Sequence, residues 1–231
     1  SSREVVSTVS ARLQDDCGHD IDNGNSSVNL VCLAVTVAPD TNIVMATVDN
    51  VAHPGTSGNI ALPSASLGIA QSFLEGFRVA HATSDHHMKQ VQFIAGLETN
   101  GNIGQIAAFA QMSDGSGHVA TGSVDGSLVA ATLAQSGLLA QSLLDRQTSG
   151  AITVGFGRPI VAGAALLQSY CAAFSGDDHH VREIGGGASK CAVQGGKLVL
   201  TDARAFMSDG SGNRQSDGAS RVSMVAFGIP G

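Results

Sequence analysis

One sequence pattern occurs twice in this chain, and it limits the folds that the chain can adopt. Gln71-Ser72-Phe73 is followed by Asp85-His86-His87, and Gln168-Ser169-Tyr170 is followed by Asp178-His179-His180. The block Met-Ser-Asp-Gly-Ser-Gly then comes in each copy, at residues 112–117 and 207–212. A repeat in this order predicts that the chain is internally duplicated, with a period of roughly 95 residues.

Part of the repeated unit occurs a third time near the N-terminus, where Leu13 and Asp15 align with Met207 and Asp209. We therefore expect two similar units. Residues 1–120 would form the first unit, including an N-terminal strand pair, and residues 121–231 the second. The alternative is a single large sandwich in which the units form one compact body. A chain of 231 residues suits either arrangement.

Short apolar stretches, separated by clusters of Gly, Asp, Asn and Ser, run through the whole chain. Apolar and polar residues alternate in 199–206 and 221–225, as they do in strands with one buried face. The pattern predicts an all-β fold made of two jelly-roll or sandwich-like units. Helix should be minor, because only residues 138–144 and 160–170 offer a competing helical spacing.

The charge composition excludes several classes of partner. Only 13% of the residues are charged, and the net charge is −7. A surface that neutralises phosphates needs the opposite balance, so we expect no nucleic-acid partner. The longest apolar runs, residues 30–38 and 159–167, fall well short of the roughly 20 residues of a membrane-spanning helix. No membrane span is therefore expected.

The four cysteines differ between the copies of the repeat. Cys171 takes the place of Leu74, and Cys32 takes the place of Ala130. Cysteines that appear in pairs predict two local disulfides, Cys17 with Cys32 and Cys171 with Cys191, and hence an oxidising compartment or a particle exterior. The alternative is four buried thiols in a reducing compartment, because free cysteine packs well in cores.

The histidine doublets are the main candidates for a binding site. Alternation along a strand would place His87 beside Lys89, and His180 beside Arg182. A histidine and a cation could bind a carboxylate, a sulfate or a sugar hydroxyl, with Asp85 or Asp178 fixing the imidazole tautomer. The alternative is a half-exposed strand start at which Asp and His bond to nearby backbone groups.

Calcium is the one cofactor that the sequence suggests. Carboxylates stand in Gly-rich segments at Asp20, Asp22, Asp114 and Asp209, and oxygen ligands in loops suit this ion. No window completes the twelve-residue calcium loop. The alternative is turn chemistry, in which each Asp caps its own turn and the Asp-Gly-Ser-Gly block closes a long hairpin.

Sequence signatures of catalysis are absent. The chain has no Gly-x-Ser-x-Gly elbow, no His-Glu-x-x-His motif and no complete phosphate loop. We therefore expect no enzymatic activity. A hydrolase with a distant Ser, His and Asp set is kept as an alternative, because such triads are defined by geometry and not by spacing.

The favoured hypothesis is a non-catalytic, lectin-like binding or adhesive protein that acts extracellularly or at a particle surface. Glycans are the favoured ligand class, and the chain has no Trp and one Tyr, so a sugar would be held by hydrogen bonds and not by ring stacking. The alternative is a structural subunit of a virion, tail or surface-layer particle, for which low charge and abundant small residues suit subunit contacts. A homo-oligomer is expected in either case.

Overall fold

The structure, a computed structural model, describes residues 10–11, 13–14, 26–28, 43–63, 67–80, 87–132, 137–176, 179–215 and 220–231. These residues form strands and turns and contain no helix. The all-β prediction is therefore confirmed, and the two segments with a competing helical spacing lie mainly in strands β9 (Leu139–Arg146) and β11 (Ile160–Ala173). No helix able to cross a membrane is found in this part of the chain.

Seventeen strands are assigned within the described residues. In chain order they are β1 (Ile43–Ala52), β2 (Gly55–Thr56), β3 (Ile60–Ala61), β4 (Leu67–Arg78), β5 (Gln90–Asn100), β6 (Ile103–Ser113), β7 (Val119–Thr121), β8 (Ser123–Thr132), β9, β10 (Ala151–Val154), β11, β12 (Val181–Gly187), β13 (Lys190–Gln194), β14 (Lys197–Thr201), β15 (Arg204–Asp209), β16 (Arg214–Gln215) and β17 (Arg221–Pro230).

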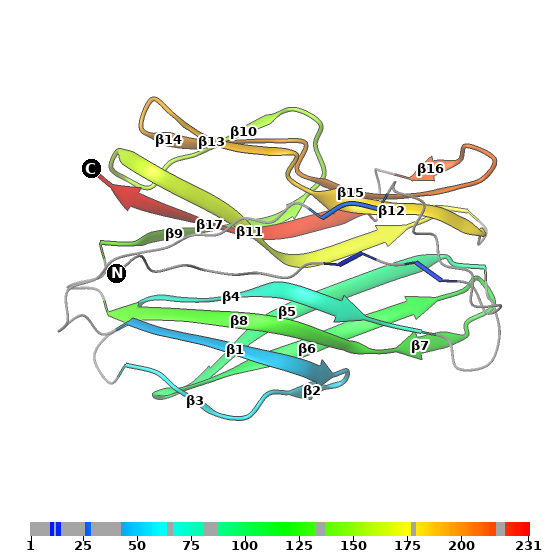
Figure 1. Cartoon of the computed structure of the whole chain (residues 1–231), viewed down its shortest axis with the longest axis horizontal. Coiled ribbons are helices and arrows are strands. Elements are labelled where there is room, and N and C mark those ends of the chain that lie inside the picture. Colours follow the sequence, from blue (N-terminus) through cyan, green and yellow to red (C-terminus); the bar gives the residue numbers. More distant parts are fainter. Residues whose placement is uncertain are drawn as a thin grey trace.

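One large sheet runs through the molecule in the order β2-β6-β5-β11-β17-β9, and β3 and β7 also pair with β6. Three smaller sheets have the orders β1-β8-β4, β10-β14-β13 and β12-β15-β16. In Figure 1, strands β1 to β8 form the lower half of the molecule and β9 to β17 the upper half. The halves are joined by antiparallel pairing of β5 with β11, from Gln90 opposite Ala173 to Ile94 opposite Ser169.

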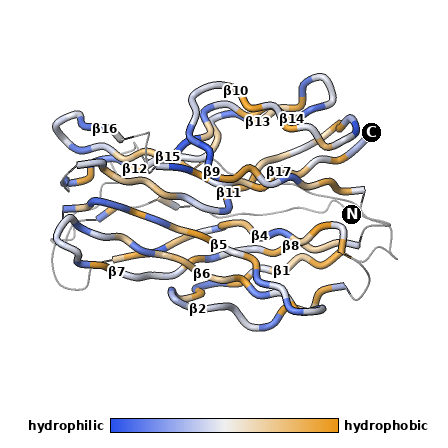
Figure 2. The backbone as a smooth tube through the Cα atoms, turned by 180° about the vertical axis from the view of Figure 1, so that it is seen from behind, coloured by the Kyte–Doolittle hydropathy of each residue, from blue (hydrophilic) through white to orange (hydrophobic). Residues whose placement is uncertain are grey.

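Each half has sheets packed against one another, in a sandwich-like arrangement. In the lower half, Leu128 of β8 packs with Ala95 of β5 and Ile106 of β6. In the upper half, Leu198 and Leu200 of β14 belong to a larger cluster that also includes residues of β11, β15 and β17. Figure 2 shows that apolar residues lie along the strands, while the most hydrophilic ones lie mainly at turns and strand ends.

The two halves share an order of strand pairing. In the lower half β8 pairs with β1 on one side and β4 on the other, and in the upper half β17 pairs with β9 and β11. The sequence repeat matches β4 with β11, since Gln71-Ser72-Phe73 lies in β4 and Gln168-Ser169-Tyr170 in β11. The duplication itself stays a prediction.

The division into units at residues 120 and 121 also stays a prediction. That boundary falls within β7, and the next strand, β8, is hydrogen-bonded to β1 and β4, which both come before it. The strands of the lower half therefore continue at least to Thr132.

An apolar cluster holds the two halves together face to face. Ile69 of β4 and Val129 of β8 pack with Val225 and Phe227 of β17. Phe73 adds an edge-on contact with Phe227, with ring centroids 6.4 Å apart. Both central strands are consequently buried on both faces over most of their length, which explains why β8 and β17 are almost continuously apolar or small.

Three consecutive glycines in β12 allow close packing on both sides of the strand. A Cβ on Gly185 would lie 2.5 Å from the Phe206 ring, and one on Gly186 would lie 2.7 Å from Cε2 of Tyr170. The Tyr170 hydroxyl reaches Phe206 O at 2.7 Å and Gly185 O at 3.2 Å. Residues 185 and 186 must therefore be glycine for β12 to lie against these rings.

The predicted disulfide between Cys171 and Cys191 is not formed, since both are free thiols in the structure. Cys191 bonds to the backbone of Ala165 on β11, and burial raises the pKa of its thiol. Cys171 lies six residues further along β11, about 20 Å at about 3.3 Å per residue. A disulfide allows a Cα separation of at most about 7 Å. The other predicted pair, Cys17 and Cys32, lies outside the described residues.

Candidate functional site

The structure brings the two histidine motifs of the repeat into direct contact. Met88 and His179 form an antiparallel bridge, in which Met88 N donates to His179 O at 2.8 Å and His179 N donates to Met88 O at 3.1 Å. The rings of His87 and His180 meet edge to face, with centroids 3.9 Å apart. We call residues 87, 88, 179 and 180 the histidine seam. The two sites that the sequence suggested therefore lie at one place.

The cations expected beside these histidines are placed differently. Lys89 is half-buried, and its backbone bonds to Ser113 O and to the amide of Phe174. A β-bulge at Arg182 interrupts the alternation on which the expected pairing of His180 with Arg182 depends. Arg182 is exposed, whereas Ile184 packs against the core. The alternation expected along this strand is therefore interrupted at Arg182, and the binding role of the seam stays a prediction.

The Asp-Gly-Ser-Gly blocks close hairpins, as the turn chemistry predicted. Oδ1 of Asp114 accepts from the backbone amides of Ser116 at 2.9 Å and His118 at 2.8 Å, between β6 and β7. Oδ1 of Asp209 accepts in the same way from Ser211 and Asn213, both at 2.9 Å, between β15 and β16. Each aspartate therefore satisfies donors of its own turn.

Calcium binding at these loops stays a prediction. The second carboxylate oxygen of Asp114 bonds to Nδ1 of His118 at 2.6 Å, and that of Asp209 accepts from Nδ2 of Asn213 at 2.6 Å. Among the described residues, no three or more His, Cys, Asp or Glu side chains are grouped to hold a metal ion. The other acidic candidates, Asp20, Asp22, Asp85 and Asp178, lie outside the described residues.

Asp209 also links its loop to the histidine seam, because its Oδ2 lies 2.8 Å from Nδ1 of His179. The Asn213 amide, followed by smaller contributions from the turn amides and His179, holds the pKa of Asp209 below its ordinary value. An imidazole oriented by a carboxylate is two-thirds of a Ser, His and Asp triad. No serine hydroxyl bonds to His179 within the described residues, so the hydrolase alternative stays a prediction.

A pocket with both polar and apolar walls lies between the two halves. It has a volume of about 490 Å³, and its lining comes from β4, β5, β9, β11 and β17. The apolar cluster around Phe73 and Phe227 closes the same interface on one side. The contact between the halves is therefore apolar in one part, where it holds the halves together, and opens into a pocket of mixed polarity in the other.

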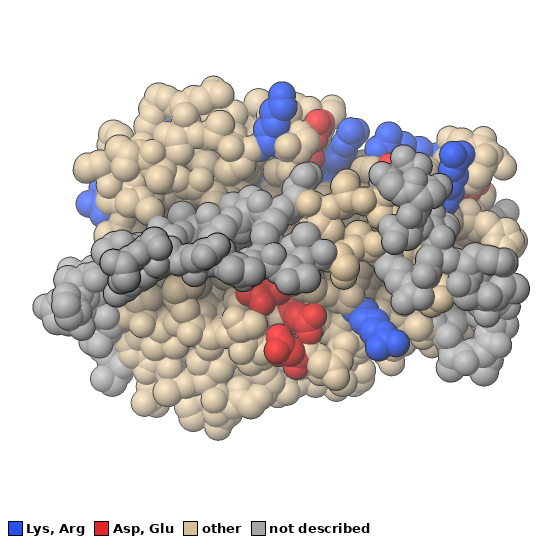
Figure 3. Space-filling view, in the orientation of Figure 1, with Lys and Arg blue, Asp and Glu red and all other residues tan. Residues whose placement is uncertain are grey.

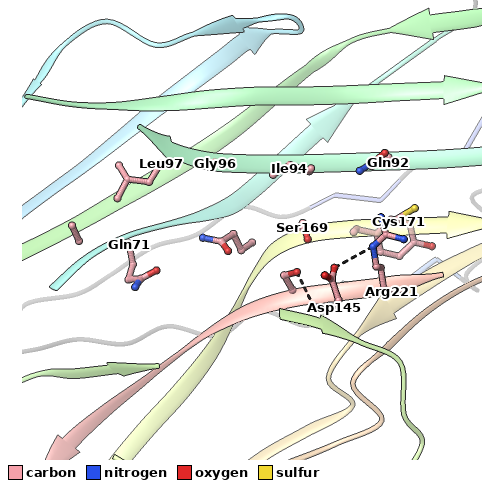
Figure 4. Close-up of a pocket in the computed structure, with 13 residues that line it drawn as sticks. Gln71, Gln92, Ile94, Gly96, Leu97, Asp145, Ser169, Cys171 and Arg221 are labelled. Carbon is pink, nitrogen blue, oxygen red and sulfur yellow. Dashed lines mark hydrogen bonds and ion pairs between the residues drawn. The ribbon is translucent and has the colours of Figure 1, made fainter. Parts of the chain in front are cut away.

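Strand periodicity explains which side chains reach the pocket. Gln92, Ile94 and Gly96 alternate along β5 with the buried Val91, Phe93 and Ala95, so they share the opposite face. On β11 a bulge between Leu167 and Ser169 breaks the alternation, and both Gln168 and Ser169 line the pocket. Figure 4 shows Gln92, Ile94, Gly96 and Leu97 along β5, with Gln71 at the Leu97 end of the row and Ser169 close to Ile94.

Two of the pocket's amides have unused hydrogen-bonding capacity. Gln168 Nε2 donates to Ser72 O at 3.1 Å across the interface. The side chains of Gln71, Gln92 and Ser169 make no hydrogen bond with other described residues, although all three are half-buried. An amide can form up to four hydrogen bonds. The pocket therefore has hydrogen-bond donors and acceptors that a ligand could use.

The charged groups of the pocket neutralise each other. Arg221 Nε lies 3.1 Å from Asp145 Oδ1, as Figure 4 also shows. The Asp145 amide donates to Ser223 Oγ at 3.2 Å, which fixes the residue at a β-bulge where its φ is +50°. Because each of these two charges is neutralised by the other, neither requires a counter-charge from a ligand. The described lining therefore suits a neutral molecule.

The surface charges elsewhere are divided between the halves. On the face shown in Figure 3, Lys and Arg side chains lie mainly over the upper half, and Asp and Glu side chains form a group on the lower half. In the lower half Asp125 Oδ1 accepts from the Asn50 amide at 2.7 Å, and the Ser127 hydroxyl donates to Glu75. These two carboxylates lie at the bulges of β1 and β4, so they have a local structural role.

Sequence reasoning did not identify the pocket. Gln71 and Gln168 were recognised as markers of the repeat, but Gln92, Asp145 and Arg221 belong to no motif. The available signal was a glutamine in the same place in both copies, within stretches that are otherwise mostly apolar. A polar residue at a position that faces another sheet indicates either a paired network or a ligand. No family model, no curated protein and no solved structure matches this chain.

Proposed function

We propose that this protein is a non-catalytic binding module that holds a neutral, hydroxyl-rich ligand, a glycan, in the pocket between its halves. The observation that carries the proposal is the half-buried set of Gln71, Gln92 and Ser169, whose side chains have no hydrogen-bond partner among the described residues. Half-buried polar groups gain most from a ligand that replaces the water they would otherwise bind. Sugar hydroxyls are such donors and acceptors.

The size and charge of the pocket agree with this class of ligand. Pockets for small molecules typically have volumes of about 300–1,000 Å³, and this one has about 490 Å³. Because Arg221 is already paired with Asp145, the pocket has no unpaired positive charge to bind the negative charge of a phosphate or a sulfate. Ile94 and Leu97 add an apolar wall, which suits the C–H face of a sugar ring. We place this binding activity at a cell or particle exterior, where glycans are displayed.

The test is direct binding of a panel of neutral and charged glycans to the full chain, followed by calorimetry with the best binder. The double variant Gln71→Ala/Gln92→Ala should bind about 30-fold more weakly, since each lost hydrogen bond contributes about 1 kcal/mol and 1.4 kcal/mol is tenfold. Gln194→Ala, an exposed glutamine outside the pocket, is the control. Unchanged affinity in the double variant, or no glycan bound by the native chain, would contradict the proposal.

A structural subunit of a larger particle is the second candidate. Met45 on β1 and Leu144 on β9 are 67% and 59% exposed, and both strands are at the edges of their sheets in the described structure. Exposed apolar residues on edge strands favour association with another chain. Light scattering across a concentration series separates the candidates, because a stable monomer would contradict the particle role and leave glycan binding unaffected.

A further inference from the structure

The walls of the pocket combine two kinds of chemistry in a small space. Gln92 and Ile94 are two residues apart on the same face of β5, so an amide stands next to a branched alkyl group. Gln71 reaches the pocket from β4. A ligand with hydroxyls alone would satisfy the amides and leave Ile94 in contact with water or with polar groups. An entirely apolar ligand would leave the amides unpaired, at a cost.

An acetamido group matches both kinds of chemistry. It has one N–H donor, one carbonyl acceptor and one methyl group. A glutamine amide has a donor and an acceptor side by side, and it can bond reciprocally to the N–H and the carbonyl of another amide. The methyl group then has an apolar partner in Ile94, whose side chain belongs to none of the packed core clusters of the described residues.

The inference follows from this match and rests on the proposed glycan binding. We infer that the pocket selects a neutral sugar that carries an acetamido group, an N-acetylhexosamine, over the corresponding plain hexose. Gln92 binds the amide of the ligand, Ile94 beside it contacts the methyl group, and the paired Asp145 and Arg221 require no charge from the ligand. Gln71, at the Leu97 end of the pocket, bonds to hydroxyl groups of the sugar.

The experiment measures the affinities of N-acetylglucosamine and glucose, each as its methyl glycoside, for the full chain by calorimetry. The acetamido sugar should bind at least about tenfold more tightly, because its amide adds a second hydrogen bond to a glutamine amide and its methyl group adds an apolar contact with Ile94. Ile94→Ala should weaken the acetamido sugar about fourfold, the effect of one lost methyl contact. It should leave glucose unchanged.

Leu144→Ala is the matched control for Ile94→Ala, because it also shortens a branched alkyl side chain to alanine. Leu144 is exposed on β9 and lies outside the pocket lining. Thermal unfolding of both variants verifies that they are folded. Equal affinities for the two sugars, both lowered in Gln71→Ala/Gln92→Ala, would overturn the acetamido inference and support the glycan pocket. Binding of other glycans at the pocket but of neither sugar would also overturn the inference. Failure of every glycan would overturn the inference and the proposed function together.

Discussion

His87 and His180, one from each copy of the sequence repeat, contact each other edge to face with ring centroids 3.9 Å apart. The bridge between Met88 and His179 holds their backbones together at the same point. The contact thus joins the lower half to the upper half at the end of the β5–β11 pairing. It adds a polar connection to the apolar one made by Phe73 and Phe227.

A double-mutant cycle measures what this contact contributes. We expect His87→Ala and His180→Ala each to lower the free energy of unfolding, and the double variant to lose less than the sum, with a coupling of about 0.5–1.5 kcal/mol for a ring pair. Urea unfolding at neutral pH gives the four values. Additive losses would show that the rings do not interact in solution. Affinity for a pocket ligand should not change, because neither histidine lines the pocket.

The carboxylate of Asp209 should make the stability of the fold depend on pH in the acidic range. The pKa of Asp209 is lower in the folded chain than its ordinary value of 3.8, first because Asn213 donates to its carboxylate. A lowered folded-state pKa stabilises the fold above pH 3.8, and this contribution is lost as the pH falls through the folded value. The melting temperature of the native chain should therefore fall as the pH is lowered below 3.8. Asp209→Asn should reduce this dependence of the melting temperature on pH.

Asp202→Asn is the control for this prediction. Asp202 lies 3.9 Å from Arg204 in a partly exposed pair, which contributes little to stability. A pH profile of Asp209→Asn that is parallel to that of the native chain would refute the role of the turn carboxylate.

Adding one methyl group to β12 should destabilise the fold. In Gly186→Ala the new Cβ would lie 2.7 Å from Cε2 of Tyr170 and 2.8 Å from the backbone oxygen of Arg204. Because a backbone atom cannot move aside freely, we expect a loss of about 1–3 kcal/mol in the free energy of unfolding. Gly155→Ala, where a Cβ would have no neighbour within 4 Å, should be neutral or slightly stabilising. Equal effects of the two substitutions would contradict the packing described for the glycine triplet.

Tyr170 provides a spectroscopic probe, because it is the one tyrosine of the chain. Burial, with a smaller effect from Cys171, raises its pKa well above the ordinary value of 10.0. A raised folded-state pKa means that the folded chain keeps the phenol proton, so stability falls as the pH rises above 10.0. Tyrosinate absorbance should therefore appear only together with unfolding. Tyr170→Phe should lack the signal and lose about 1–3 kcal/mol, since Phe206 O loses its donor. Reversible ionisation near pH 10 in the folded chain would contradict this burial.

Local patterns in the sequence predicted the strands and the hairpins well. Alternation in 199–206 corresponds to β14 and β15, and the Asp-Gly-Ser-Gly blocks became the turns after β6 and β15. Both depend on nearest neighbours along the chain, because the pleat sets the alternation and an aspartate caps amides two and four residues ahead.

Features that depend on distant segments were not predictable in the same way. The bulge at Arg182 occurs in the pairing of β12 with β15, and no residue pattern in β12 predicts it. The disulfide between Cys171 and Cys191 was predicted because both are missing from the other copy of the repeat, but the two residues lie in separate sheets and are free thiols. The pocket arises only where β4, β5, β9, β11 and β17 meet, which requires the tertiary fold.

The pairing of β11 has a consequence for how this chain unfolds. β11 is hydrogen-bonded to β17 in the upper half and, through residues 169–173, to β5 in the lower half. Separation of the halves would expose a sheet edge on each side together with the apolar faces around Phe227. We therefore expect cooperative melting, with a single calorimetric transition whose van't Hoff and calorimetric enthalpies agree, whereas two resolved transitions would mean that each half folds alone. If the melting is cooperative, the pocket between the halves lies at the same junction that makes the two halves unfold together.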